Sequence, residues 1–310
     1  MNVTALAGGV GGAKLAVGLQ SVLRSRDSSS LTVIVNTADD DVVYGLHVSP
    51  DVDIVTYWLA GLADTDRGWG LRGDTFAVVD ALDRLGVPTW FRLGDRDMAT
   101  CLYRTHQLRA GASPASIADD IRKRLGVWAR VVPMSDDPVR SVVTTKDGRT
   151  LAFQEYFVKE RHMPEVATVT FEGIENAKPS NGVLDAIASA DVVIVCPSNP
   201  VVSIGPILAL PGVRNALVDH ARVMAVSPIV ERAPLKGPAD KLMHSIGVDV
   251  SAAGVAWLYR DFCDVFVIDA RDESEREGIE RSGTDVLVTD TIMVDHHASA
   301  AVAAACLDAS

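Results

Sequence analysis

The chain has 310 residues, 48% of them hydrophobic, which is enough to bury one large core or two unequal ones without disulfides or metals. Its formal net charge of −12, with basic residues scattered along the chain, argues against nonspecific binding to nucleic acid or to a membrane surface. No apolar stretch approaches the roughly 20 residues that cross a bilayer, and Cys101, Cys196, Cys263 and Cys306 lack the paired spacing of zinc or redox motifs. We therefore expect a cytoplasmic protein with buried thiols.

The first expected strand, at residues 3–7, runs directly into residues 8–14, GGVGGAK, which we call the glycine loop. Glycines allow a tight turn that brings backbone N–H groups to an anion, and the apolar periodicity that follows begins a helix whose N-terminus adds a favourable dipole. We predict that the glycine loop binds the phosphates of a nucleotide. The alternative is a strand-to-helix turn that is merely tight.

The glycine loop matches neither of two common phosphate-binding motifs. The P-loop has Ser or Thr after its lysine, but Leu15 follows Lys14, so the hydroxyl that binds magnesium is missing. The dinucleotide fingerprint, counted from Gly9, would place its third glycine at Lys14, and the second expected strand, residues 31–35, is followed by Asn36 instead of a ribose-binding acid. A dinucleotide-dependent oxidoreductase is therefore a poor interpretation.

Apolar runs typical of buried strands alternate with helical periodicities along the chain, which predicts an α/β fold: a Rossmann-like, mostly parallel, doubly wound sheet in one domain, residues 1–310. Two regions break this alternation. Residues 51–125 are expected to form a helical insertion, and residues 129–172 a small antiparallel β subdomain with a hairpin turn at Asp147-Gly148. The expected strands of the main sheet are residues 3–7, 31–35, 192–196, 223–226, 265–268 and 285–288, and the expected helices of the insertion are residues 76–85, 98–108 and 114–125.

Carboxylates follow the second expected strand. Asp39, Asp40 and Asp41 come soon after it, and Asp51 and Asp53 open a helix ten residues later. Ligands of open α/β sheets bind beyond the carboxyl ends of the strands, and these carboxylates would repel a diphosphate there unless a hard cation such as Mg²⁺ lay between them. The alternative is a solvated loop at residues 39–41 and a helix cap at Asp51 or Asp53.

Two further segments carry polar side chains at the ends of expected elements. Residues 92–97, RLGDRD, carry positive and negative side chains beside a glycine. The alternative to a role in the site is a cluster of ion pairs at the surface. Residues 197–200, PSNP, offer a hydroxyl and a side-chain amide that can bind a base or a phosphate, although proline-rich turns are often only structural. No nucleophile-elbow sequence accompanies these segments, so a covalent mechanism has little support.

Together these segments resemble the 2-phospho-L-lactate transferase family of coenzyme F420 biosynthesis, which is CofD, or FbiA in actinobacteria, over nearly the whole chain. The resemblance rests on residues 8–14, 35–40, 50–53, 93–97, 133–138 and 197–208, in that order. It implies a Mg-dependent 2-phospho-L-lactate or phosphoenolpyruvate transferase that is a homodimer. The implied substrates are Fo (7,8-didemethyl-8-hydroxy-5-deazariboflavin) and a guanosine diphosphate ester of a three-carbon acid. The ribityl hydroxyl of Fo attacks the phosphorus that bears the acid, GMP leaves, and coenzyme F420-0 or its dehydro or glyceryl analogue forms.

Such a transfer needs charge neutralisation and placement of the acceptor hydroxyl more than it needs a nucleophilic side chain. We therefore expect Asp53 and Asp40 to be catalytic, and Asp39 and Asp53 to bind Mg²⁺. By the resemblance, Asp53 and Arg92 match positions that contact Fo. The residues expected to bind the nucleotide are Gly9, Gly11, Gly12, Lys14, Ser198 and Asn199.

Another interpretation is a non-catalytic, nucleotide-sugar-binding metabolic regulator related to this family. Such proteins share the glycine loop and the acidic loop after the second strand, but they lack the segments Leu-Gly-Asp-Arg-Asp and Pro-Asp-x-Asp, which are present here at residues 93–97 and 50–53. The sequence leaves open whether the donor carries 2-phospholactate, phosphoenolpyruvate or 3-phosphoglycerate, because these acids differ only by a methyl, a methylene or a hydroxyl.

Overall fold

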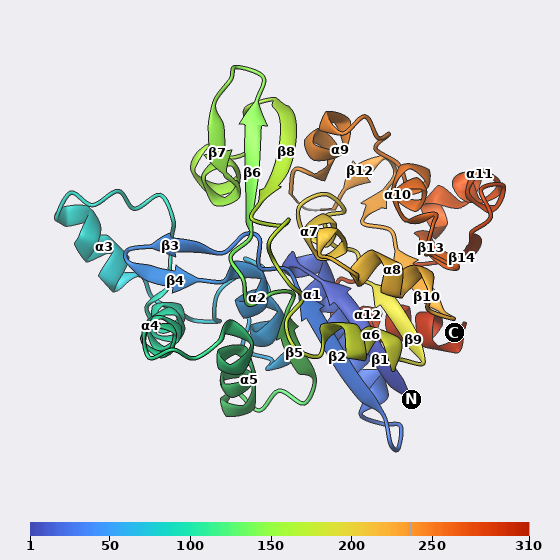
Figure 1. Ribbon diagram of the computed structural model, residues 1–310, viewed down its shortest axis with the longest axis horizontal. Helices are drawn as coiled ribbons and strands as arrows, with labels where there is room; N and C mark the ends of the chain where they lie inside the picture. The colour runs from blue at the N-terminus through green and yellow to red at the C-terminus, as the bar shows by residue number, and fades with distance from the viewer. Residues whose placement is uncertain (236, 310) are drawn as a thin grey trace.

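The computed structural model describes residues 1–235 and 237–309, and it confirms the predicted α/β fold (Figure 1). A seven-stranded sheet lies at its centre, with the strand order β14-β13-β10-β9-β1-β2-β5 and parallel pairing throughout. Its strands are β1 (Asn2–Ala7), β2 (Ser30–Val35), β5 (Arg130–Pro133), β9 (Val192–Val195), β10 (Val223–Val226), β13 (Val265–Asp269) and β14 (Asp285–Thr289). The six strands expected from the apolar runs are all present.

Strand β5 corrects one prediction. We expected antiparallel structure from residue 129 onward, but β5 pairs parallel with β2 and extends the main sheet. Val131 packs into the core on one face of the sheet and Val132 into the core on the other. Burial on both faces is typical of a strand in a parallel sheet covered by helices, and a run of four residues is too short to reveal it.

Helices cover both faces of the sheet, because successive side chains of each strand point to opposite faces. In β9, Val193 and Val195 pack into one core, and Val192 and Ile194 into the other. The core of Val192 is formed with α1 (Gly9–Leu23), α2 (Pro50–Leu59), α5 (Pro114–Arg124) and α12 (His296–Asp308). The core of Val193 is formed with α6 (Val183–Ala188), α7 (Ile204–Ala209), α8 (Val213–Val218), α9 (Ala239–Ser245), α10 (Ala252–Tyr259) and α11 (Arg276–Glu280).

The helical insertion has a small core of its own, formed by Val43, Val48, Val79, Leu93 and Cys101. This core joins α3 (Ala77–Arg84) and α4 (Asp95–Arg109) to a hairpin of β3 (Asp41–Val43) and β4 (Leu46–Val48). The hairpin was not predicted. Its strands have three residues each, and its turn places Tyr44 at a φ of 53° and Gly45 at 75°, a conformation that tyrosine rarely adopts.

The β subdomain has the predicted hairpin turn at Asp147-Gly148, between β6 (Arg140–Thr145) and β7 (Thr150–Ala152). Strand β6 also pairs antiparallel with β8 (Val166–Glu172), and a π-helix, η1 (Glu155–Lys159), lies between β7 and β8 in the chain. Figure 1 shows the β subdomain at the top of the view and the helical insertion at the left. The remaining elements are β11 (Ile229–Val230), β12 (Ala233–Pro234) and the 3-10 helix η2 (Ala270–Glu275).

The strand order contains one topological switch point. From β1 the chain proceeds outward to β2 and β5, and it then returns to the other side of β1 to form β9, β10, β13 and β14. The loops after β1 and β9 therefore lead away in opposite directions, and ligands of open α/β sheets bind in the crevice that such loops leave. None of the described helices is long and apolar enough to cross a membrane.

We predict that Gly18→Ala destabilises the fold by about 1–3 kcal/mol, because overpacking of a tight contact costs about that much. Gly18 lies on α1, and a Cβ atom there would come 2.1 Å from the backbone oxygen of Ser299 on α12. The matched control is Gly278→Ala, which adds the same methyl group to a helix where no atom lies within 4 Å. Denaturant unfolding measures both, and equal stability of the two variants would contradict the prediction.

Candidate active site

A cavity of about 820 Å³ lies at the switch point, beyond the carboxyl ends of β1 and β9. The glycine loop, α2, the helical insertion, the β subdomain and the loop after β9 all contribute to its wall. Residues that line it include Gly9, Gly11, Lys14, Asp39, Asp53, Tyr57, Trp69, Arg92, Asp97, Phe153, Phe157, Ser198, Asn199 and Met293. The structure thus brings together most of the predicted site residues, from segments far apart in the sequence.

The glycines allow the loops after β1 and β9 to pack closely together. A Cβ atom on Gly11 would lie 2.2 Å from the carbonyl oxygen of Pro197, and one on Gly12 would lie 2.5 Å from Oγ of Ser198. The hydroxyl of Ser198 accepts a hydrogen bond from the Gly8 N–H (3.0 Å) and donates one to the Gly8 carbonyl (2.8 Å). Gly11 and Ser198 line the cavity, whereas Gly12 is buried against Ser198.

Asp51 binds the N-terminus of α1. The backbone N–H of Gly9, at a φ of 57°, donates to Oδ1 of Asp51 (2.9 Å), and Nδ2 of Asn36 donates to the other carboxylate oxygen (3.0 Å). A carboxylate is favoured at this end of a helix by the helix dipole. Asn36 is buried here, and an acid in its place would face Asp51 without a hydrogen to donate, which explains why an amide follows β2.

Lys14 and Asn199 line the cavity but also hold its wall together. Nζ of Lys14 donates to the backbone oxygen of Met293 (2.7 Å), which connects α1 to the segment before α12. Oδ1 of Asn199 accepts from the backbone N–H groups of Val201 (3.0 Å) and Val202 (3.2 Å). Both side chains are therefore fixed at the surface of the cavity by contacts within the protein.

Asp39 and Asp53 are buried carboxylates of the main cavity, and each has an oxygen that pairs with no described residue. Both line the cavity, and Oδ1 of Asp39 and Oδ2 of Asp53 are buried with no hydrogen-bond partner within the described ranges. Burial raises the pKa of both groups, and the charge of Asp51 raises that of Asp39 further. Leaving such an oxygen unpaired is costly, and a cation such as Mg²⁺ would relieve this cost.

The structure places Asp40 away from the main cavity. Its Oδ2 accepts from the hydroxyl of Ser49 (2.7 Å) and lies 3.8 Å from Nε2 of His47. Asp40 lines a second, much smaller cavity together with Thr37, His47 and Arg104. Oδ1 of Asp40 is buried without a hydrogen-bond partner among the described residues, like Oδ1 of Asp39 and Oδ2 of Asp53. The catalytic role of Asp40 stays a prediction, and the structure places its side chain in the smaller cavity.

Arg92 lies at the rim of the main cavity, with 44% of its side chain exposed. Nη1 of Arg92 pairs with Asp80 (2.8 Å), and its guanidinium lies 4.7 Å from the centroid of the Phe76 ring. Both partners belong to the α3 region of the insertion. The ion pairing that was the alternative interpretation of this segment is thus present, and Arg92 also lines the cavity.

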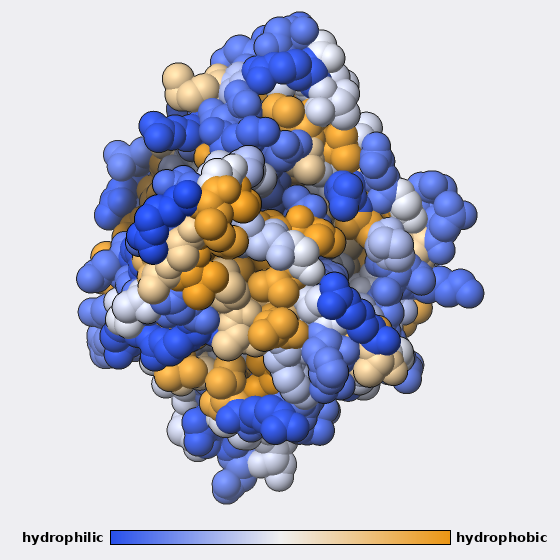
Figure 2. All heavy atoms as spheres, turned by 90° about the vertical axis from the view of Figure 1, so that its left-hand side faces the viewer, coloured by the Kyte–Doolittle hydropathy of each residue, from blue (hydrophilic) through white to orange (hydrophobic). Residues whose placement is uncertain are grey.

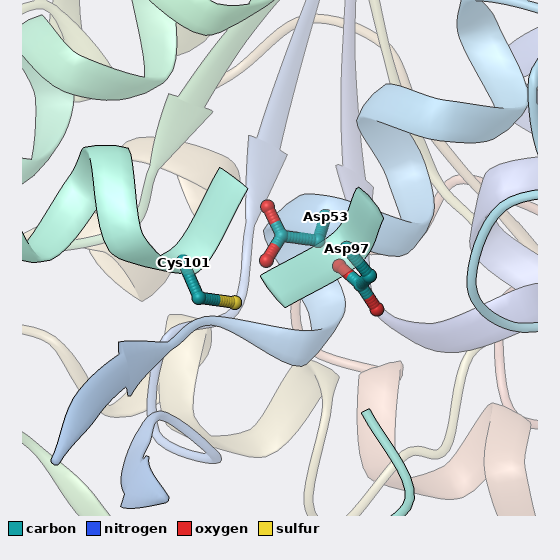
Figure 3. Close-up of side chains that lie close together, drawn as sticks. All are labelled: Asp53, Asp97 and Cys101. Carbon is teal, nitrogen blue, oxygen red and sulfur yellow. The ribbon is translucent and has the colours of Figure 1, made fainter. Parts of the chain in front are cut away.

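A cluster around Asp53, which was not predicted from the sequence, includes Asp97, Cys101 and Arg104 of α4. Figure 3 shows the Asp53 and Asp97 carboxylates close together with the Cys101 sulfur directed toward them, and ligand atoms of the three lie within 4.8 Å of one another. The hydroxyl of Tyr57 donates to Oδ1 of Asp97 (2.8 Å), and the Arg104 guanidinium forms an ion pair with Oδ1 of Asp53. The spacing of i, i+4 and i+7 that places these α4 residues on one helix face was a usable signal.

Aromatic rings form another part of the cavity wall. The rings of Phe153 and Phe157 stack with their centroids 5.6 Å apart and an interplanar angle of 4°, and Phe157 also stacks with His162 at 5.7 Å. Trp69 and Phe91 line the cavity from the insertion. On the face shown in Figure 2, apolar side chains gather in the middle between hydrophilic margins. Flat apolar surfaces of this kind suit a planar ring system.

Comparisons with known proteins show which family the sequence matches and which fold it shares. A sequence model of the family described as "2-phospho-L-lactate transferase CofD" matches residues 3–306. A protein named 2-phospho-L-lactate transferase from Methanosarcina mazei is 41% identical over 286 residues, which cover 92% of this chain and 93% of that protein. One named phosphoenolpyruvate transferase, from Streptomyces griseus subsp. griseus, is 42% identical over 314 residues, which cover 99% of this chain and 98% of that protein. A solved structure of a UPF0052 family member from Bacillus halodurans has a TM-score of 0.66 at 18% identity, with 99% of both chains covered, and it shows a likeness of fold alone.

We predict that Asp97 makes the stability of the protein depend on pH. Burial, with the charge of Asp53, raises the pKa of Asp97 to about 7 from an ordinary value of 3.8. The folded protein therefore keeps a proton on Asp97 that the unfolded chain has lost. The stabilisation is complete below pH ~4 and is lost as the pH rises through ~7.

The test is Asp97→Asn, whose side-chain oxygen can still accept the hydrogen bond from Tyr57. Between pH 5 and 8 in the presence of a chelator, we expect the wild type to lose about 2 kcal/mol more of its free energy of unfolding than the variant does. The difference between the two proteins is the informative quantity, because burial lowers the pKa of His47 to about 4, which contributes with the opposite sign. Parallel pH profiles would show that Asp97 is ionised throughout.

Proposed function

Because the chain belongs to the CofD family of 2-phospho-L-lactate transferases, we propose that it transfers a phosphorylated three-carbon acid from its guanosine diphosphate ester to the ribityl hydroxyl of Fo. The products are GMP and coenzyme F420-0 or its dehydro or glyceryl analogue. In this reaction the hydroxyl oxygen bonds to the phosphorus that carries the acid, and the bond from that phosphorus to the bridging oxygen breaks. The bridging oxygen leaves on GMP, and the proton of the hydroxyl is released.

The observation that carries this proposal is the pair of buried carboxylate oxygens on Asp39 and Asp53 that lack hydrogen-bond partners in the part of the chain that is described. Both residues line a cavity large enough for two substrates, and the glycine loop at the start of α1 lines the same cavity. Asp39 and Asp53 would hold Mg²⁺. When bound, the ion would neutralise charge on the diphosphate that is transferred and released.

The two substrates would occupy different parts of the wall. We propose that the guanosine diphosphate portion lies along the glycine loop, Lys14, Ser198 and Asn199, where the N-terminus of α1 favours an anion. The deazaflavin ring of Fo would lie against the aromatic wall, with Arg92 and Asp53 contacting the acceptor. Asp53 would then orient the ribityl hydroxyl toward the phosphorus, since positioning supplies much of the rate in such transfers.

Purified protein with Fo, Mg²⁺ and each guanylyl ester in turn tests the reaction and identifies the donor. We expect GMP release and a product whose mass reports the acid, and we expect both to stop when a chelator removes Mg²⁺. Turnover without divalent metal would refute the metal dependence. Binding of nucleotide without any transfer would instead favour the non-catalytic regulator.

Asp53→Asn should lower turnover by about 100-fold or more, because removing a preorganised group that acts on developing charge costs that much. The fold should persist, since the amide is isosteric with the carboxylate. The matched control is Asp119→Asn on α5, a carboxylate that pairs with Arg122 and Lys123 outside the cavity wall. Circular dichroism checks the fold of both variants, and an active Asp53→Asn would exclude Asp53 from the mechanism.

We further propose that the enzyme acts in the cytoplasm as a homodimer. The support is the family resemblance together with the finding that no described helix could span a membrane. Light scattering of the purified protein measures the oligomeric state, and a monomeric mass at working concentration would refute the dimer.

A further inference from the structure

We infer that Arg104 is a positioning residue that fixes the Asp53 carboxylate in the orientation that leaves its second oxygen available to a cation. This inference rests on the proposed function, because it assigns Asp53 to the metal. Arg104 does not itself line the main cavity; it contributes to the wall of the smaller cavity that also contains Asp40. It therefore acts on the ligand only through Asp53.

The guanidinium of Arg104 connects three elements. It forms an ion pair with Oδ1 of Asp53 on α2, and Nη1 donates to the backbone oxygen of His47 on β4 (3.3 Å) and lies 3.8 Å from Sγ of Cys101 on α4. Only 6% of the Arg104 side chain and 7% of the Asp53 side chain are exposed. The pair is thus removed from water and held from several directions, so the position of one group determines the position of the other.

One oxygen of Asp53 is held and the other is not. Oδ1 accepts from Arg104, whereas Oδ2 is buried and has no partner among residues 1–235 and 237–309. The backbone of Asp53 is fixed as well, because its N–H donates to the Ser49 carbonyl in the first turn of α2 (2.9 Å). With the backbone and one oxygen fixed, the direction of the remaining oxygen is fixed too.

Arginine suits this task better than lysine. Its planar fork can donate to a carboxylate and to a backbone carbonyl at the same time, whereas lysine is a point charge that would hold one partner well. Arg104 also offsets the charge of a buried group of acids, which includes Asp40, Asp53 and Asp97. A lysine would keep that positive charge, so Arg104→Lys tests the geometry of the contact and not its charge.

The test compares the wild type with Arg104→Lys in activity, in metal binding and in stability. We expect kcat to fall about 10- to 100-fold and the dissociation constant for Mn²⁺, titrated alone by electron paramagnetic resonance, to rise about tenfold, as is typical when a residue that orients a metal ligand is changed. KM for the guanylyl ester should change less than about threefold, because Arg104 does not line the cavity proposed for that substrate. The melting temperature should stay close to that of the wild type.

Arg122→Lys on α5 is the matched control. Arg122 also joins a carboxylate, that of Asp119 (2.6 Å), to a backbone carbonyl, that of Val127 (3.3 Å), and its side chain is 16% exposed. It lines neither cavity. We expect this variant to keep the kcat and the Mn²⁺ affinity of the wild type.

A double-variant cycle separates positioning from an independent effect. If Arg104 acts through Asp53, then Arg104→Lys should not weaken Mn²⁺ binding further in a protein that already carries Asp53→Asn, and an additive loss would overturn the inference. Wild-type kcat and Mn²⁺ affinity in Arg104→Lys would also overturn it, as would a loss of activity that only follows the unfolded fraction.

If Arg104→Lys does not fold, Arg104→Gln replaces it in the test, because the glutamine amide can still donate to one of the two partners. Failure of both variants to fold would assign Arg104 a structural role and overturn the inference. The Mn²⁺ titration does not need the reaction. An inactive wild type with every ester would refute the proposed function, while the cycle would still decide the role of Arg104.

Discussion

Buried negative charge is the constraint on which the cavity wall depends. Asp39, Asp51, Asp53 and Asp97 all line one cavity and are almost completely removed from water. A buried carboxylate is costly unless it is hydrogen-bonded or paired, and like charges nearby add to the cost. The burial of these groups raises the pKa of each of them. Without a cation, the site is therefore less stable than an apolar wall of the same shape would be.

Three of these four acids have partners within the protein, and the partners explain the surrounding sequence. Asp51 takes the first N–H of α1 and the amide of Asn36, and Asp97 takes the hydroxyl of Tyr57. Asp53 has the guanidinium of Arg104. Among the carboxylates that line this cavity, Oδ1 of Asp39 and Oδ2 of Asp53 are buried without a hydrogen-bond partner in the described residues. These two oxygens are the physical basis of the proposed metal site.

The parts of the structure that the sequence predicts are those that depend on local pattern. Apolar runs identify the buried strands of the parallel sheet, and Asp147-Gly148 identifies the hairpin, because period and turn chemistry are properties of a few adjacent residues. Strand β5 is too short for its pairing to be predicted from the sequence. The hairpin β3–β4 depends on Tyr44 at a positive φ. Tyrosine disfavours this conformation, and the surrounding structure imposes it. Local pattern therefore predicts elements better than it predicts their partners.

In the candidate site, too, local pattern predicts the residues better than their partners. The acidic segment after β2 could be predicted as a group, but the separation of Asp39 from Asp40 into two cavities depends on how β3, β4 and α4 pack, which no spacing in the segment encodes. Arg104 lies 51 residues after Asp53, and nothing near it in the sequence marks it as the partner. The sequence does place Arg104 on the same helix face as Asp97 and Cys101. This spacing becomes informative only once that face is known to meet α2.

The glycine loop has two explanations that are compatible in the structure. Gly11 and Gly12 are required for the close approach of the loop after β9, which is a packing reason, and Gly9 and Gly11 also line the cavity, which is a binding reason. The backbone N–H of Gly9 is already taken by Asp51, so an anion of the protein itself occupies the first donor of α1. If a nucleotide binds as proposed, its phosphates could use this helix end only in part, and a cation held by Asp39 and Asp53 would have to offset the rest of their charge. In the proposed function, the metal held by Asp39 and Asp53, with Asp53 oriented by Arg104, would therefore contribute to diphosphate binding alongside the glycine loop.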